Sequence, residues 1–344
     1  MPRYTVAAVL IVRDEAARLH RALDSLRAWT DRLVVLDTGS QDDTVAVARM
    51  AGAEVSHFRW CDDFSLARNA ALAQAGADWH IVLDGDEWLA RGGETLATLR
   101  TLRPDFVGAV RVDSDQGPKD GASVSSSWIS RILPGHVRYA GRIHEQPQHA
   151  LPVRRLPLRV GHDGYAPGAL QRKAGRNAAL LQRALDEHPD DPYLWYQLGK
   201  DHDVYGRHAE ALHCFGQAES RLAGRAARPA WLHDLSVRSL HGLKCCGRHA
   251  DGMQRAAASM ARWERSPDFF FALGDLMLDW AASEPARAGE LLPMIEGAWQ
   301  RCLEIGERPD LEGAVHGRGS HLATHNLEVL RTFSSALVHI ETEA

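Results

Sequence analysis

Apolar residues in the first part of the chain gather into short, unbroken runs. These runs cover residues 4–12, 33–36, 53–58 and 79–83. Unbroken runs of this length are typical of strands that are buried on both faces of a sheet. They therefore predict four strands in the interior of one sheet.

Between the runs, apolar residues recur with the period of a helix. Residues 14–29 carry an apolar stripe formed by Leu19, Ala22, Leu23, Leu26 and Trp29. Such a stripe predicts an amphipathic helix, and further helices are expected from Asp43 to the stop signal at Gly52 and at 64–75. Strands separated by helices predict βαβ units and an α/β fold around a parallel sheet.

The pattern loosens after these units. Further strands are expected at 106–112, 125–133 and 153–160. The first two are separated by turn-forming residues at 113–123, which predict a mobile loop. The last strand candidate runs into a Gly-His-Asp-Gly-Tyr turn, and the α/β pattern ends there.

The second half of the chain has almost no strand pattern and is rich in alanine and leucine. One stretch matches the spacing of a tetratricopeptide unit through Trp195, Leu198, Gly199, Gly206, Ala211, Phe215 and Ala218. Phe270, Leu273 and Gly274 repeat part of that unit, and residues 161–194 would form a degenerate copy. An irregular helical bundle is the alternative to a repeat domain.

Length and charge narrow the possible roles. A chain of 344 residues is long enough for two domains, which we place at 1–165 and 166–344. The net charge of -5 shows no basic excess, so nucleic acid is not expected as a partner. Five cysteines without a Cys-x-x-Cys pair indicate a reduced, cytoplasmic setting. The first apolar run is too short to span a bilayer, so no transmembrane segment is expected there.

Asp84-Gly85-Asp86 follows the apolar run at 79–83 directly. In open α/β sheets ligands bind at the carboxyl ends of strands, and two carboxylates placed there can hold a hard divalent cation. Such a cation would neutralise a diphosphate as it leaves. An acidic turn with no ligand is the alternative, but the βα units that precede this motif favour a functional site.

Two further polar residues are candidates for binding a ligand. Asp37 ends the run at 33–36 and could accept hydrogen bonds from a base or a ribose, or could serve a helix-capping turn. Arg68 suits a phosphate oxygen or a base edge. The alternative for Arg68 is a salt bridge with Asp62 or Asp63.

Two histidine segments complete the candidate chemistry. His144-Glu145 lies in a stretch without periodicity and could supply a general base, or could belong to a surface loop. His162 could be a metal ligand, although a lone histidine is more often structural. The histidines form no His-Glu-x-x-His or other zinc spacing. The chain also has no P-loop, Gly-x-Gly-x-x-Gly or Gly-x-Ser-x-Gly motif, which disfavours P-loop NTPases, dinucleotide oxidoreductases and α/β hydrolases.

In chain order, the segments IVRDE, VVLDTGSQDDT, WCDDFSLARNAAL, DWHIVLDGDE and GRIHEQ resemble family-2 glycosyltransferases of the GT-A fold, a Rossmann-like fold that binds nucleotide-diphospho-sugars. The chain is more closely similar to the branch in which tetratricopeptide-like helices follow that domain. This branch includes bacterial glycosyltransferases that modify cysteine or serine of bacteriocin peptides. The resemblance covers residues 4–165 and, for the repeat, 184–218.

The resemblance implies roles for individual residues. It implies that the nucleotide-sugar donor is bound by Val12, Arg13, Asp37, Arg68, Asp84 and Gly85. Asp86, with Asp84 and His162, would ligate Mg²⁺ or Mn²⁺. Where the family usually has a second acidic residue after the second strand, this chain has Thr38. Glu145 would act on the acceptor side as the base, with Asp113 and Asp115 as rivals.

The resemblance therefore implies a metal-dependent, inverting hexosyltransferase with a UDP-hexose donor. The acceptor would be a peptide side chain, or alternatively a glycan of the lipopolysaccharide type. The helical domain would bind the peptide or pair two chains in a homodimer. A sugar nucleotidyltransferase is a weaker alternative because it needs a Gly-rich basic loop where Arg13-Asp14-Glu15 stands. A repeat scaffold with a decayed transferase domain is the non-enzymatic alternative.

Overall fold

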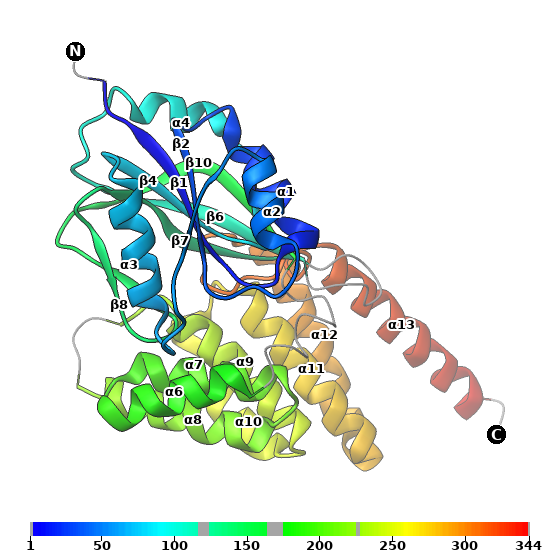
Figure 1. The fold of residues 1–344 in the computed structure, drawn as a ribbon. Coiled ribbons are helices and arrows are strands. Elements are labelled where there is room, and N and C mark those ends of the chain that lie inside the picture. Colours follow the sequence, from blue (N-terminus) through cyan, green and yellow to red (C-terminus); the bar gives the residue numbers. More distant parts are fainter. Residues whose placement is uncertain (1–2, 116–123, 164–174, 225–227, 343–344) are drawn as a thin grey trace. The chain divides into compact units, whose positions relative to one another are not determined.

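The computed structural model describes residues 3–115, 124–163, 175–224 and 228–342 (Figure 1). The chain divides into two compact units, Met1–Glu187 and His188–Ala344. The boundary predicted at 165/166 lies outside the described residues and stays a prediction. Most of the loop predicted at 113–123 and the first part of the degenerate copy at 161–194 also lie outside them.

The four apolar runs form parallel neighbouring strands, as predicted. They are β1 (Val6–Val12), β2 (Arg32–Asp37), β3 (Glu54–His57) and β4 (Trp79–Asp84), in the spatial order β3-β2-β1-β4. Every residue of β1 is buried, which is what an unbroken apolar run requires of a strand with a neighbour on each side.

The sheet continues beyond β4 with strands of mixed direction. These are β7 (Val124–Pro134), β6 (Val107–Asp115), β10 (Val153–His162) and β5 (Glu87–Arg91), giving eight strands among the described residues. The pairs β4–β7, β6–β7 and β5–β10 are antiparallel, whereas β6 and β10 are parallel. A separate ribbon pairs β8 (Arg138–Ala140) with β9 (Gln146–Gln148).

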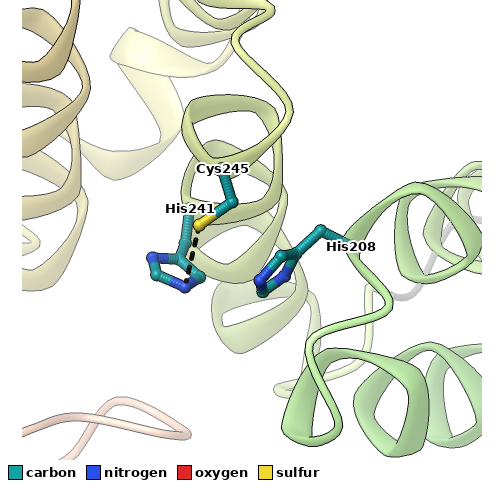
Figure 2. A group of neighbouring side chains, drawn as sticks. All are labelled: His208, His241 and Cys245. Atoms are coloured by element: carbon teal, nitrogen blue, oxygen red, sulfur yellow. Dashed lines mark hydrogen bonds between the residues drawn. The ribbon is translucent and has the colours of Figure 1, made fainter.

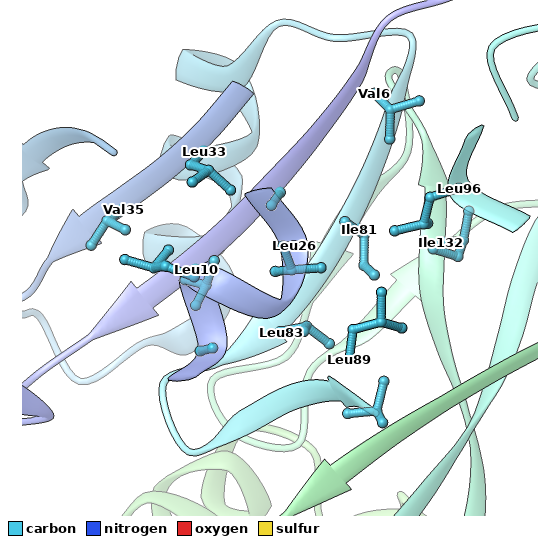
Figure 3. Close-up of a cluster of buried hydrophobic side chains, with 14 of the residues drawn as sticks. Val6, Leu10, Leu26, Leu33, Val35, Ile81, Leu83, Leu89, Leu96 and Ile132 are labelled. Atoms are coloured by element: carbon cyan, nitrogen blue, oxygen red, sulfur yellow. The ribbon is translucent and has the colours of Figure 1, made fainter. Parts of the chain in front are cut away.

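Helices cover the sheet on both faces. They are α1 (Ala16–Arg27), α2 (Thr44–Met50), α3 (Phe64–Ala75) and α4 (Gly93–Leu99), and α6 (Arg176–Glu187) ends the first unit. Alternate residues of β1 enter different cores. Leu10 packs with residues of α1, α2 and α4 in one cluster, whereas Val9 packs with residues of α3 in the other. Figure 3 shows the first cluster, with Leu10 close to Leu26 of α1.

Local signals set both ends of α3. The Asp63 carboxylate accepts the backbone N–H of Leu66 at 3.0 Å, which satisfies one of the amides left open by the first turn. Gly76 ends the helix in the left-handed region at φ 53°. The start of this helix determines where Arg68 lies relative to the sheet.

The described part of the second unit is helical, as predicted. Its helices are α7 (Pro192–Val204), α8 (His208–Leu222), α9 (Leu232–Cys245), α10 (His249–Trp263), α11 (Pro267–Ser283), α12 (Ala288–Ile305) and α13 (His321–Thr342), with a 3-10 turn η1 (Pro285–Arg287) before α12. Within the described ranges, no helix is long and apolar enough to cross a membrane.

Two helix pairs of this unit share one packing device. A Cβ placed on Gly199 of α7 would lie 2.4 Å from a ring carbon of Phe215 on α8. A Cβ on Gly274 of α11 would lie 2.5 Å from Nε1 of Trp299 on α12. Each glycine therefore lets an aromatic ring of the next helix reach the backbone. Gly274 belongs to the partial repeat that the sequence suggested, and its contact resembles that of Gly199.

Candidate active site

Three adjacent parallel strands end at the same edge of the sheet. In the register of the sheet, Val12 of β1 is opposite Asp37 of β2, and Ile11 is opposite Asp84 of β4. The carboxylates predicted from separate motifs therefore lie at one edge, on strands that flank β1. This edge is where ligands bind in open α/β sheets.

Asp37 is buried, with 4% of its surface exposed, and its carboxylate holds the turn that follows β2. It accepts the backbone N–H groups of Gly39 and Ser40, each at 3.2 Å. His57 Nδ1 lies 3.3 Å from the same carboxylate. The turn itself is anchored to β1, because the Thr38 N–H donates to the Val12 carbonyl at 2.9 Å.

The segment after β1 is fixed beside this turn. Asp14 adopts a positive φ of 56°, and its backbone N–H donates to Ser40 Oγ at 3.0 Å. Its carboxylate accepts the N–H of Gln41 at 2.7 Å. The Arg13 side chain is 52% exposed and lies 3.8 Å from the Asp14 carboxylate. Val12 and Arg13 therefore border the Asp37 turn on a fixed backbone.

Two buried arginines hold the Asp84 carboxylate. Arg68 Nη2 lies 2.6 Å from one oxygen and Arg131 Nη2 lies 3.0 Å from the other. Burial opposes ionisation of Asp84, but the charges and hydrogen bonds of the two arginines outweigh it and lower its pKa well below the ordinary range. Asp84 is therefore an anion whose two oxygens are already engaged.

Arg131 did not emerge from the sequence analysis. It lies in β7, a strand next to β4, and also contacts Glu87 Oε1 at 2.5 Å. The available signal was a charged residue inside the strand predicted at 125–133.

Glu87 is 3% exposed and fixes the turn between Asp84 and Asp86. Its Oε2 accepts the backbone N–H of Asp84 at 3.0 Å. Burial raises the pKa of Glu87, and Arg131 only partly offsets this. Glu87 therefore has a structural role: it holds the turn that carries Asp84 and Asp86.

Asp86 faces a histidine from a distant strand. Its carboxylate lies 3.7 Å from His162 Nε2, and the other ring nitrogen of His162 lies 3.0 Å from Ser114 Oγ. Burial disfavours a charged His162, but Asp86, with Glu87 and Asp84 beyond it, raises its pKa overall. The surroundings of Asp86 therefore favour a positive charge.

Gly85 lets another loop approach the turn closely. A Cβ on this residue would lie 2.9 Å from Glu15 Cγ. Glu15 pairs with Arg18 at 2.9 Å, and Arg18 lies 3.4 Å from the carboxylate of Asp163. The segments that follow β1, β4 and β10 therefore meet at this turn.

Glu145 reaches the same site through Arg68. The Arg68 Nε–H bonds to Glu145 Oε1, and only 9% of the Glu145 side chain is exposed. The β8–β9 ribbon, whose connecting loop carries Glu145, is bound to α3, because Asn69 exchanges two hydrogen bonds with the backbone of Tyr139, at 2.8 and 2.9 Å. The alternative pairing of Arg68 with Asp62 or Asp63 is not observed among the described residues: Arg68 pairs with Asp84 and Glu145.

Three buried polar atoms near Asp84 have no hydrogen-bond partner among the described residues. They are Arg68 Nη1, Arg131 Nε and the hydroxyl of Tyr139. Burial, only partly offset by the arginines, raises the pKa of Tyr139 to about 12, so its hydroxyl keeps its proton. Buried polar atoms are nearly always paired, so these donors are available to a ligand oxygen or an ordered water.

The rival acidic residues lie in β6. Asp113 Oδ1 is already engaged by Arg111 Nε at 2.6 Å and by Ser126 Oγ at 2.7 Å. The side chain of Asp115 lies outside the described residues. The site residues brought together are thus Asp37, Arg68, Asp84, Gly85, Asp86, Glu145 and His162, with Val12 and Arg13 at its border.

Residues 7–158 match the family model described as Glycosyl transferase family 2. The chain is 35% identical over 212 residues to a TPR repeat-containing protein of Synechococcus elongatus, covering 56% of this chain and 51% of the relative. It is 28% identical over 218 residues to the SPbeta prophage-derived glycosyltransferase SunS of Bacillus subtilis, covering 60% and 51%. The chain thus spans about half the length of the curated relatives it matches.

Among solved structures, the chain matches glucosyl-3-phosphoglycerate synthase from Mycobacterium tuberculosis in complex with Mn²⁺ and UDP-glucose. The identity is 25%, the match covers 32% of this chain and 43% of the synthase, and the TM-score is 0.27.

Proposed function

We propose that the chain transfers a hexose from a UDP-sugar to an acceptor with the help of Mg²⁺ or Mn²⁺, because residues 7–158 match the Glycosyl transferase family 2 model. The observation that carries this proposal is the position of Asp84 and Asp86. They follow a buried strand directly, at the edge where Asp37 also ends its strand. Carboxylates at such an edge are suited to a cation and a diphosphate.

The residues around Asp86 fit a divalent cation. The Asp86 carboxylate and His162 Nε2 offer an oxygen and a nitrogen ligand 3.7 Å apart, in surroundings that favour positive charge. Asp84 contributes mainly through its negative charge, since both of its oxygens bind arginines. When bound, the cation would stabilise the charge of the departing diphosphate.

The donor would lie along the carboxyl edge. Asp37, with the Val12–Arg13 backbone beside it, supports recognition of the uridine. Asp84 and Gly85 would lie under the ribose and diphosphate, in the turn against which Glu15 packs. Arg68 supplies the positive charge that a nucleotide needs. A diphosphate oxygen that reached the unpaired Nη1 of Arg68 would complete the bonding of that side chain.

On the acceptor side we place Glu145 as the general base of an inverting displacement. The acceptor nucleophile would attack the anomeric carbon as the bond to the diphosphate breaks, and its proton would pass to the Glu145 carboxylate. The Arg68 Nε–H donates to this carboxylate and so fixes its orientation in the site. A peptide side chain is our proposed acceptor, with a glycan as the second candidate.

The test of the whole proposal is hydrolysis of a panel of nucleotide sugars by the purified chain, with Mn²⁺, with Mg²⁺ and with EDTA. We expect slow, metal-dependent release of UDP from one or more UDP-hexoses and none in EDTA. A folded chain that responds to no nucleotide sugar under any of these conditions would contradict the proposal and favour the scaffold.

The role of Glu145 has its own test. We expect Glu145→Gln to lower kcat by about 100-fold, the lower end of what a general base contributes, with little change in the donor KM. Glu94→Gln, an exposed residue of α4, is the matched control, and Asp113→Asn tests the rival base. A raised donor KM with an unchanged kcat would instead make Glu145 a residue that positions Arg68.

A further inference from the structure

Three side chains with metal-binding atoms meet in the second unit. They are His208, His241 and Cys245, and their ligand atoms all lie within 4.8 Å of one another. His208 is the first residue of α8, whereas His241 and Cys245 are one turn apart on α9. Figure 2 shows the two histidine rings and the thiol facing one common space.

His208 is oriented as metal-binding histidines usually are. Its Nδ1 lies 3.1 Å from one oxygen of Asp203, and the other oxygen of Asp203 receives the Arg238 guanidinium at 2.7 Å. A carboxylate at Nδ1 fixes the proton there and leaves the lone pair of Nε2 for a ligand. The carboxylate is itself held in place, so the ring has little freedom to turn away.

The distance between His241 and Cys245 matches the coordination sphere of zinc. His241 Nε2 lies 3.5 Å from Cys245 Sγ. With Zn–N bonds of about 2.0–2.1 Å and a Zn–S bond of about 2.3 Å, two ligands at a tetrahedral angle lie about 3.5 Å apart. The histidine rings are nearly perpendicular, at 83°, with centroids 5.5 Å apart. Rotation of the exposed His241 and Cys245 side chains toward His208 by about 1 Å would close the set.

We propose that His208, His241 and Cys245 bind a borderline-soft divalent transition metal, of which Zn²⁺ is the representative, with a water in the fourth position. A thiolate and two imidazoles select such an ion over Mg²⁺ or Mn²⁺, which prefer the oxygen-rich surroundings of Asp86. Binding forms one metal–sulfur and two metal–nitrogen bonds, and the thiol proton is released to solvent. His241 and Cys245 are exposed, so the ion can enter and exchange directly.

The test uses the full chain, stripped with EDTA and titrated with Co²⁺ as a spectroscopic substitute for Zn²⁺. We expect one strong site per chain with a thiolate-to-cobalt charge-transfer band. Cys245→Ser should abolish the band. It should also weaken binding at least about 100-fold, because loss of a residue that only hydrogen-bonds to a metal ligand already weakens binding by up to about 100-fold. Asp203→Asn should weaken binding by about 10–100-fold.

Matched controls separate this site from other thiols, histidines and carboxylates. Cys246→Ser, the adjacent cysteine, and His213→Gln, an exposed histidine of α8, should keep the band, and so should Asp86→Asn. Circular dichroism would establish that each variant is folded. The proposal is overturned if the wild-type chain gives no charge-transfer band, if Cys245→Ser binds as tightly as wild type, or if Cys246→Ser loses the band.

Discussion

We expect Asp86→Asn to lower metal-dependent turnover of the nucleotide-sugar donor by about 10³-fold or more. The substitution keeps the size of the side chain and removes the negative charge that faces His162 at 3.7 Å. A cation that stabilises a leaving phosphate contributes several kcal/mol to the transition state, and about 1.4 kcal/mol corresponds to a factor of ten in rate. Donor hydrolysis measured against Mn²⁺ concentration gives both the rate and the apparent metal affinity.

The matched control is Asp24→Asn on α1, whose side chain is 62% exposed and lies outside the site. It should leave turnover unchanged. If Asp86→Asn, correctly folded, kept wild-type turnover and wild-type Mn²⁺ dependence, Asp86 would not be the metal ligand. The assignment of this edge of the sheet as the transferase site would then be wrong.

The second large effect concerns stability. We expect Arg131→Met to lower the free energy of unfolding by about 3–5 kcal/mol, because it leaves the buried carboxylate of Glu87 without its partner. Arg131 lies 2.5 Å from Glu87, which is 3% exposed, and 3.0 Å from Asp84. Methionine has a similar reach, so the loss reports the missing charge more than a missing volume. Urea unfolding followed by circular dichroism measures the change.

Two controls identify the cause of that loss. Arg3→Met removes an arginine whose side chain is 74% exposed and should change the unfolding free energy by less than about 1 kcal/mol. The double variant Arg131→Met with Glu87→Gln should recover part of the stability, because the amide no longer leaves a buried charge unpaired. A double variant as unstable as the single one would show that packing of Arg131, rather than its charge, matters.

Much of the first unit could be predicted from local signals. The helix expected at 64–75 has the same bounds as α3, because its cap at Asp63 and its stop at Gly76 lie in the chain itself. The predicted α/β fold is confirmed by the sheet and its helices, and residues 7–158 match the family-2 model, in agreement with the resemblance. Motifs that occur in a fixed order, with unbroken apolar strands between them, are specific enough to predict the fold and the family.

The parts that could not be predicted depend on contacts between distant segments. Arg131 joins the site only because β7 runs antiparallel beside β4. The strands β5, β8 and β9 were missed because they are short and partly exposed, which leaves no apolar run to find. The helix α4 was missed as well, since only two large apolar residues, Leu96 and Leu99, mark its buried side.

The histidine–cysteine cluster illustrates the same limit in the second unit. His241 and Cys245 are four positions apart, a spacing that is visible in the sequence but common in helices. His208 belongs to another helix far away in the chain, and only the packing of α8 on α9 brings its ring to them. A search for contiguous zinc motifs therefore finds nothing.

The double burial of β1 has a consequence for how accurately the edge of the sheet is assembled. A slip by one residue turns every side chain of a strand to the opposite face of the sheet, and every residue of β1 packs in one of two cores. A slip would force Leu10 and Val9 to trade packing environments built for different shapes. Packing on both faces of the sheet therefore fixes the register that places Val12 opposite Asp37 and Ile11 opposite Asp84.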